Sequence, residues 1–181
     1  MSAPDPNASQ PASAEHRPQT SKEKEEFSSG GKRYMLLLRG PTGLKIDKAI
    51  LWLTGYSIMT KQYSLAGGVP YQPTLIVTTK GARTGKKRTA SLPYFVVDDD
   101  WVIRGSNGGG PTDPHWVHNI RACSEARVRV GWRSYDVHAH VASGEERERL
   151  YERLSAMSPS TEAYQRMCAP RELPLVILRK V

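Results

Sequence analysis

The chain has 181 residues, and its 26 lysines and arginines outnumber its 18 acidic residues, which gives a formal net charge of +8. This length allows one domain with a substantial core, and no apolar run reaches the roughly eighteen residues that a membrane span needs. The positive charge favours acidic partners, such as phosphorylated or carboxylate-rich small molecules, nucleic acid or an anionic membrane face.

Residues 1–33 differ in composition from the rest of the chain. They are rich in Pro, Ser, Ala, Gln, Glu and Lys, and Phe27 is their only aromatic residue. Such a segment buries too little apolar surface to offset the entropy of ordering, so we expect a disordered tail over residues 1–33 and one folded domain over residues 34–181. The tail has no apolar core of the signal-peptide type, and Cys123 and Cys168 form no CxxC pair. We therefore expect a cytoplasmic protein with free thiols.

The first helix is expected over residues 45–59, where Ile46, Ile50 and Leu53 recur at helical spacing. In one interpretation this apolar face packs against a sheet. In the alternative it rests on a membrane surface, because lysines flank it. The alternative would make the protein peripheral on the cytoplasmic face of the inner membrane.

Residues 74–95 form the stretch around which the chain is organised. A β-branched run is followed by a glycine-containing turn and a second extended run, which predicts a β-hairpin. Five of the nine residues from Lys80 to Arg88 are basic. The turn could be a solvated tip that protects a sheet edge, or its guanidinium groups, hydroxyl and glycines could bind an anion. It is not a Walker loop, because the GxxxxGK[ST] spacing is absent.

A second candidate anion site lies one strand further along. After a turn at residues 98–100 and a strand at residues 101–104, four glycines fall within residues 105–110. Asp113 before Pro114 is typical of an N-cap, so we expect a helix over residues 115–123 whose N-terminus points back at this glycine loop. The basic turn and the glycine loop could therefore share a ligand.

The remaining segments predict strands at residues 128–132, 137–141 and 174–178, a helix at residues 145–157 and a short amphipathic turn around Tyr164. The sum is a mainly β fold, mostly antiparallel, with flanking helices and a small barrel that closes its own edges.

Isolated reactive side chains give weaker signals. His115 and His118 lack a third ligand at suitable spacing, so no metal site is expected. No GxSxG elbow surrounds Ser91 or Ser106, which argues against nucleophilic catalysis. Tyr164 could donate a proton in a pocket or be an ordinary half-buried tyrosine.

Several linked motifs resemble the deazaflavin-dependent nitroreductase family, whose quinone and nitro reductases use reduced coenzyme F420. The motifs are residues 78–85 (TTKGARTG) with Arg88-Thr89, residues 106–109 (SNGG), residues 114–116 (PHW) with Asn119, and Tyr164-Gln165 before Pro174. The resemblance covers about residues 46–178. It implies a split β-barrel, like that of FMN-binding oxidoreductases, as the cofactor-binding domain. In it the basic hairpin would hold the phosphate and glutamate tail of the deazaflavin.

The resemblance also implies site residues. The cofactor-lining positions are Arg83, Thr84, Arg88, Thr89, Ser91, Ser106, Asn107, Gly108, His115, Trp116 and Asn119. Tyr164 or Ser106 would hydrogen-bond the acceptor oxygen as it becomes negative, and these two are the catalytic candidates. The chain departs from the family at Ala82 and Asn107, where basic residues are frequent. It also has Ser158 and Thr161 where the best-known nitroreductase has tyrosines.

These observations favour an oxidoreductase that passes a hydride from reduced coenzyme F420 to a quinone-like or nitro acceptor, although the lost tyrosines disfavour bulky nitro compounds. One alternative is a non-catalytic deazaflavin- or lipid-binding protein of the same fold, and another is an FMN-binding reductase. A nucleic-acid binder is disfavoured, because aromatic residues are not interleaved with the basic ones as stacking platforms require.

Overall fold

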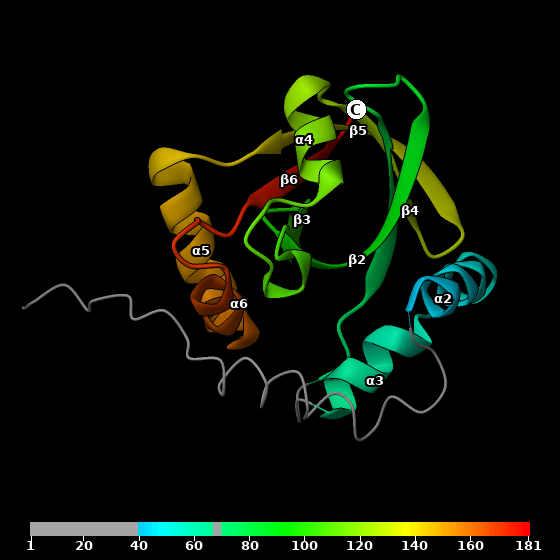
Figure 1. The fold of residues 1–181 in the computed structure, drawn as a ribbon, viewed down its shortest axis with the longest axis horizontal. Helices are drawn as coiled ribbons and strands as arrows, with labels where there is room; N and C mark the ends of the chain where they lie inside the picture. The colour runs from blue at the N-terminus through cyan, green and yellow to red at the C-terminus, as the bar shows by residue number, and fades with distance from the viewer. Residues whose placement is uncertain (1–39, 67–69) are drawn as a thin grey trace, which may run out of the picture.

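The computed structural model describes residues 40–66 and 70–181, so the tail expected over residues 1–33 lies outside the described residues. Within these ranges, a closed antiparallel barrel has the strand order β1-β2-β3-β6-β5-β4 (Figure 1). The strands are β1 (Thr74–Lys80), β2 (Lys87–Val97), β3 (Asp100–Arg104), β4 (Glu125–Val130), β5 (Arg133–Val141) and β6 (Leu175–Lys180). The mainly β, mostly antiparallel barrel expected from the sequence is confirmed.

The β1–β2 hairpin has the register that its sequence pattern predicts. Thr74 pairs with Pro93 at the open end, and Lys80 pairs with Lys87 next to the turn. The β-branched run of β1 is buried almost throughout, which suits a strand inside a closed barrel. The basic turn therefore projects from the end of two long paired strands.

Helix α4 (His115–Ala122) lies across one end of the barrel (Figure 1). Its residues Trp116, Val117 and Ile120 join the cluster of buried side chains that fills the barrel interior, which includes Leu75 and Ile103. The amphipathic pattern of this short helix thus places it as a lid on the core. The helix expected over residues 115–123 is confirmed to within one residue.

A second apolar cluster lies on the outside of the barrel, beneath α5 (Gly144–Met157) and α6 (Ser160–Cys168) (Figure 1). Leu150 and Leu154 of α5 pack there against Phe95 and Ile177 of the sheet. The short turn expected around Tyr164 is in fact helix α6. Helix α6 lies against the glycine loop, residues 105–110.

The single helix expected over residues 45–59 is wrong, because the chain forms α2 (Gly40–Thr54) and then α3 (Ile58–Ala66). Gly55 breaks the helix with φ of +73°, and a Cβ there would lie 3.2 Å from the Cα of Gly131. The buried Asp47 holds the two helices together, since it accepts hydrogen bonds from Ser57 Oγ at 2.7 Å and from the Met59 N–H at 2.9 Å.

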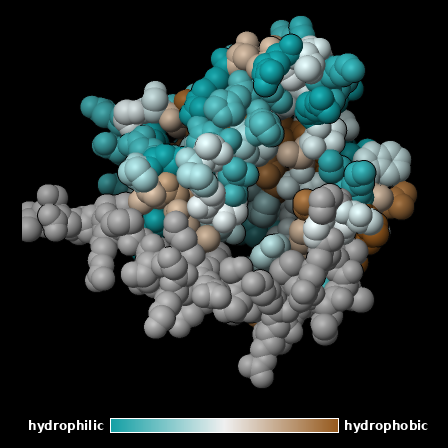
Figure 2. Space-filling model, viewed as in Figure 1, coloured by the Kyte–Doolittle hydropathy of each residue, from teal (hydrophilic) through white to brown (hydrophobic). Residues whose placement is uncertain are grey.

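Helix α2 leaves much of its apolar surface uncovered. Leu44, Ile46, Trp52 and Leu53 are all exposed, and brown atoms mark this region at the right edge of Figure 2. Contact of this face with a membrane stays a prediction. None of the helices in the described part of the chain has the length and hydrophobicity needed to cross a bilayer.

Candidate active site

A pocket of about 790 Å³ lies between the β1–β2 turn, the glycine loop after β3 and the start of α4. Ten of the eleven residues expected to line a cofactor surround it: Arg83, Thr84, Arg88, Thr89, Ser106, Asn107, Gly108, His115, Trp116 and Asn119. The structure thus brings the basic turn and the glycine loop together around one space, which we call the main pocket.

Ser91 is the expected residue that does not line the main pocket. Its neighbours Ala90 and Leu92 do line it, and successive side chains of a strand point to opposite faces. The Ser91 hydroxyl is buried, and it has no hydrogen-bond partner among the described residues. We therefore do not place Ser91 beside a ligand in this pocket.

Asn119 of α4 fixes the basic turn to the barrel. Its side-chain amide donates to Thr79 Oγ1 at 3.0 Å, and its carbonyl oxygen accepts the Ala82 N–H at 3.0 Å. Arg83 and Arg88 remain exposed on the pocket wall, and neither forms an ion pair with a residue that the structure describes. A rigid turn thus presents two guanidinium groups to an incoming anion.

A further cation stands beside the turn. Lys48 of α2 donates from Nζ to the Thr89 carbonyl at 3.0 Å and to Thr89 Oγ1 at 2.9 Å. The Thr89 hydroxyl is thereby oriented by α2, and its own proton remains available to a ligand. Sequence reasoning did not link α2 to the hairpin, because the two residues are 41 positions apart.

The glycine loop contains the short 3-10 helix η1 (Asn107–Gly109), and its two central glycines have different reasons to be glycine. Gly108 has φ of +64°, and a Cβ there would meet nothing within 4 Å, so a ligand can approach the main chain. A Cβ on Gly109 would lie 2.5 Å from Cε of Met167. Gly109 therefore allows the loop to pack on α6, and Gly108 leaves its surface open.

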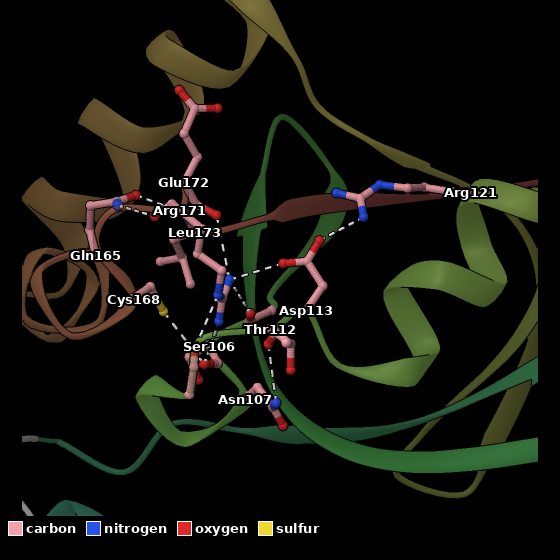
Figure 3. A network of polar contacts seen from close by, with 12 residues as sticks. Ser106, Asn107, Thr112, Asp113, Arg121, Gln165, Cys168, Arg171, Glu172 and Leu173 are labelled. Carbon is pink, nitrogen blue, oxygen red and sulfur yellow. Dashed lines mark hydrogen bonds and ion pairs between the residues drawn. The ribbon is translucent and has the colours of Figure 1, made fainter.

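Arg171 holds the glycine loop in place (Figure 3). Its guanidinium donates to the carbonyl of Ser106 at 2.8 Å and to that of Gly110 at 3.1 Å. It also pairs with Asp113 at 3.0 Å, and the other Asp113 oxygen lies 2.6 Å from Arg121. Planar donors and carbonyl acceptors in this fork arrangement fix the loop's main chain.

The expected N-cap role of Asp113 is wrong. The N-cap residue of α4 is Pro114, and no side chain caps the helix. The Asp113 carboxylate is drawn instead to the two arginines on either side of it (Figure 3). The start of α4 still lines the main pocket through Pro114 and His115.

A second, smaller pocket of about 170 Å³ adjoins the first. It is bordered by α3, α6 and the loop between α5 and α6, and Tyr164 and Ser158 line it. Arg104, the last residue of β3, lines both pockets. The two catalytic candidates therefore lie on different sides of Arg104, with Ser106 in the main pocket and Tyr164 in the small one.

Arg104 is held by hydroxyl groups and aromatic rings rather than by an acid. Its Nη1 donates to Ser160 Oγ at 3.0 Å and to Thr161 Oγ1 at 2.8 Å. The guanidinium carbon lies 4.7 Å from the ring centroid of Phe95 and 5.3 Å from that of Tyr164. Both distances are typical of cation–π contacts.

Burial dominates the acid–base properties of this pair. It lowers the pKa of Arg104 to about 10, an effect that the nearby Tyr164 partly opposes. Burial likewise raises the pKa of the Tyr164 hydroxyl, and the Arg104 charge works against that rise. At neutral pH the small pocket thus holds a cationic guanidinium beside a protonated phenol.

Residues 57–180 match the model of the F420H(2)-dependent quinone reductase family. The chain belongs to this family. An F420H(2)-dependent quinone reductase of Mycobacterium tuberculosis (strain ATCC 25618 / H37Rv) is 29% identical over 110 residues, which cover 60% of this chain and 74% of that protein.

Two solved structures are also similar. One, of an F420-H2 dependent reductase, is 30% identical with a TM-score of 0.53, and the match covers 59% of this chain and 94% of that one. The other, a domain-swapped dimer, is 26% identical with a TM-score of 0.54, and the match covers 77% of this chain and 100% of that one.

Membership of the F420H(2)-dependent quinone reductase family confirms the resemblance seen in the sequence, the split-barrel fold and coenzyme F420 as the cofactor. It also makes the chain an F420-dependent oxidoreductase.

The residues of the main pocket fit this cofactor. No lining residue is acidic, while arginines, hydroxyls and the accessible main chain at Gly108 surround the space. Such donors suit a molecule with a phosphate and carboxylates.

Sequence reasoning missed Arg171 and Arg104. An arginine at the end of the apolar run Trp101 to Ile103 was a signal for Arg104, because strands of this kind seldom end in a buried charge. Nothing local marked Arg171, which contacts Ser106 across 65 positions.

Proposed function

We propose that this protein reduces a small quinone-like acceptor with the hydride that reduced coenzyme F420 supplies. The observation that carries the proposal is the pair of adjoining pockets that share Arg104. The main pocket has the volume and the basic lining that a large acidic cofactor needs. The small pocket offers a protonated hydroxyl next to it.

On the cofactor side, the protein binds and orients. Arg83 and Arg88 hold the acidic tail from the rigid turn, and residues 106–108 and Trp116 bound the rest of the pocket. Because Asn119 and Arg171 fix these segments to the barrel, binding requires little reordering of the main chain. The deazaflavin itself supplies the hydride when bound.

On the acceptor side, Tyr164 donates a hydrogen bond to the acceptor oxygen as negative charge develops there. Its raised pKa keeps the hydroxyl protonated at neutral pH. The Ser158 hydroxyl forms a hydrogen bond with Ser160 Oγ at 2.8 Å, and the Thr161 hydroxyl donates a hydrogen bond to the Leu154 carbonyl at 3.1 Å. The small volume of this pocket favours a compact planar acceptor over a bulky nitro compound.

The test mixes purified protein with reduced coenzyme F420 and menadione and follows the cofactor's absorbance, with cofactor affinity measured by fluorescence titration. We expect Tyr164→Phe to lower kcat/KM by about 10- to 100-fold with an unchanged Kd for the cofactor. Tyr151→Phe is the matched control, because Tyr151 lies on α5 beside Arg147 and lines neither pocket.

Three other results would change the proposal. Tight cofactor binding without turnover over a panel of quinones would favour a non-catalytic binding protein. If the protein neither bound nor oxidised the reduced cofactor, the proposal would be wrong. If the purified protein showed the absorbance of bound FMN, FMN would take the place of coenzyme F420 in the proposal, and the acceptor would have to be tested again with FMN.

A further inference from the structure

The small pocket contains a largely buried positive charge that no described acid neutralises. Arg104 has hydroxyl and ring partners only, and it forms no ion pair within residues 40–66 and 70–181. Charges inside proteins are normally paired or bound to a ligand, because an unpaired one loses its hydration without compensation. This arrangement is therefore suited to receive a negative charge from outside the chain.

The guanidinium is also oriented for that purpose. Only Nη1 is engaged by Ser160 and Thr161, so Nε and Nη2 are left without a partner among the described residues. Phe95 and Tyr164 hold the guanidinium plane by contacts on the ring faces, which leave its N–H donors unused. Two free N–H groups in a fixed fork match a carboxylate, a sulfonate or a quinone oxygen.

We propose that Arg104 makes the small pocket a binding site for an anionic oxygen of the acceptor, and that the protein therefore prefers quinones that carry an acidic substituent. The preference for quinones rests on the proposed function. Binding of an anion at Arg104 does not depend on it.

The same contact would assist the reaction of a neutral quinone. Hydride transfer from the reduced deazaflavin adds two electrons and one proton, so the reduced quinone bears one negative charge until a second proton arrives from solvent. That charge resides on oxygen. A guanidinium already in position stabilises it without reorganisation.

The binding test uses 2-naphthoate and its neutral isostere 2-naphthamide, titrated into the protein saturated with oxidised coenzyme F420. Saturation occupies Arg83 and Arg88, the two exposed arginines of the main pocket. We expect wild-type protein to bind the carboxylate at least tenfold more tightly than the amide. Equal affinities would overturn the proposal, whether or not any variant folds.

The kinetic test compares 1,4-naphthoquinone with its 2-sulfonate. The kcat/KM for the sulfonate divided by that for the neutral quinone should fall at least tenfold in Arg104→Met. It should fall by less in Arg104→Lys, which keeps the charge but loses the fork of N–H donors. Differences in the reduction potential of the two quinones cancel when the ratio is compared between proteins. An unchanged ratio in Arg104→Met would overturn the proposal.

Arg166→Gln is the matched control. Arg166 lies on α6, pairs with the exposed Glu162 and lines neither pocket, so its loss should leave both ratios unchanged. A wild-type protein that binds 2-naphthoate through Arg104 but reduces no quinone would remove the proposed function and keep this inference. Quinone reduction without any preference for the charged quinone would keep the proposed function and remove this inference.

Discussion

Arg171 donates to carbonyls of the glycine loop and Arg104 directly precedes that loop, yet the surroundings of the two arginines differ in kind. Arg171 is paired with Asp113 and donates to main-chain carbonyls, so its charge is neutralised and its donors are used. Arg104 has two hydroxyls and two rings, with no described acid. Arg171 is thus neutralised by the fold that it helps to hold, whereas Arg104 carries a charge that no described acid neutralises.

The comparison indicates which of the two arginines stabilises the fold and which one destabilises it. A neutralised and fully bonded arginine adds to the free energy of unfolding. An unpaired buried arginine subtracts from it, and the lowered pKa of Arg104 reflects that cost. A feature that costs stability and borders the reaction space is a candidate for function. Replacing each arginine should therefore change stability in opposite directions.

The largest effect is expected for Arg171→Met. It leaves loop carbonyls without donors and removes one of the two partners of a largely buried Asp113. We expect the free energy of unfolding to fall by about 3 to 4 kcal/mol, as measured by urea unfolding with tryptophan fluorescence. Arg121→Met is the control, since its more exposed pair with Asp113 should contribute less than about 1 kcal/mol. Equal losses in the two variants would refute the structural role of Arg171.

Two arginines on the main pocket form a third class, because they are exposed and carry little folding energy. The double change Arg83→Gln and Arg88→Gln should raise the Kd for coenzyme F420 by about 100-fold, because two charge-assisted contacts are lost. The free energy of unfolding should stay the same within about 0.5 kcal/mol.

A control for this double variant lies in the same turn. Lys86→Gln with Lys87→Gln removes the same charge, but neither lysine lines the main pocket. We expect its effect on Kd to be no more than a few-fold and to disappear at high salt. Equal weakening by the two double variants would mean that diffuse charge, rather than a bound tail, controls affinity.

The Arg104→Met variant should be more stable than the wild type by about 1 to 3 kcal/mol, because methionine fills a similar space without a charge to desolvate. The same urea unfolding experiment measures this, and quinone reduction should fall at the same time. A destabilised variant would mean that the hydroxyl and ring contacts of Arg104 outweigh the cost of burial. Arg104 would then stabilise the fold, as Arg171 is expected to do.

Much of the barrel could be predicted because its signals are local. The β-branched run before the basic turn, and the alternation in the strands after it, specify extended chain without knowledge of any distant partner. The glycine loop could be found for the same reason. Residue types within one short window thus sufficed to locate both walls of the main pocket.

The rest depended on contacts between distant segments. The break at Gly55 is fixed by its approach to Gly131 and by the bond from Ser57 to Asp47, and no pattern within the helix announces either. Arg104 reaches Thr161 across 57 positions. Asp113 has the sequence context of an N-cap, but the arginines that the fold brings beside it outcompete the helix N–H groups for its carboxylate.

The smallest effect expected is a dependence of the Arg104 stability difference on pH. Because burial lowers the folded-state pKa of Arg104 to about 10, the unfolded state binds more protons above that pH, and wild-type stability rises relative to Arg104→Met. The advantage of Arg104→Met should therefore shrink by about 1 kcal/mol between pH 9.5 and pH 11. Urea unfolding of both proteins at each pH measures it, with Tyr164→Phe present in both because the pKa of that phenol depends on Arg104. The titration of the lysines and of the other tyrosines, which are common to both proteins, then cancels. A constant difference over this range would show that Arg104 stays charged in the fold and that its hydroxyl and ring partners compensate the charge.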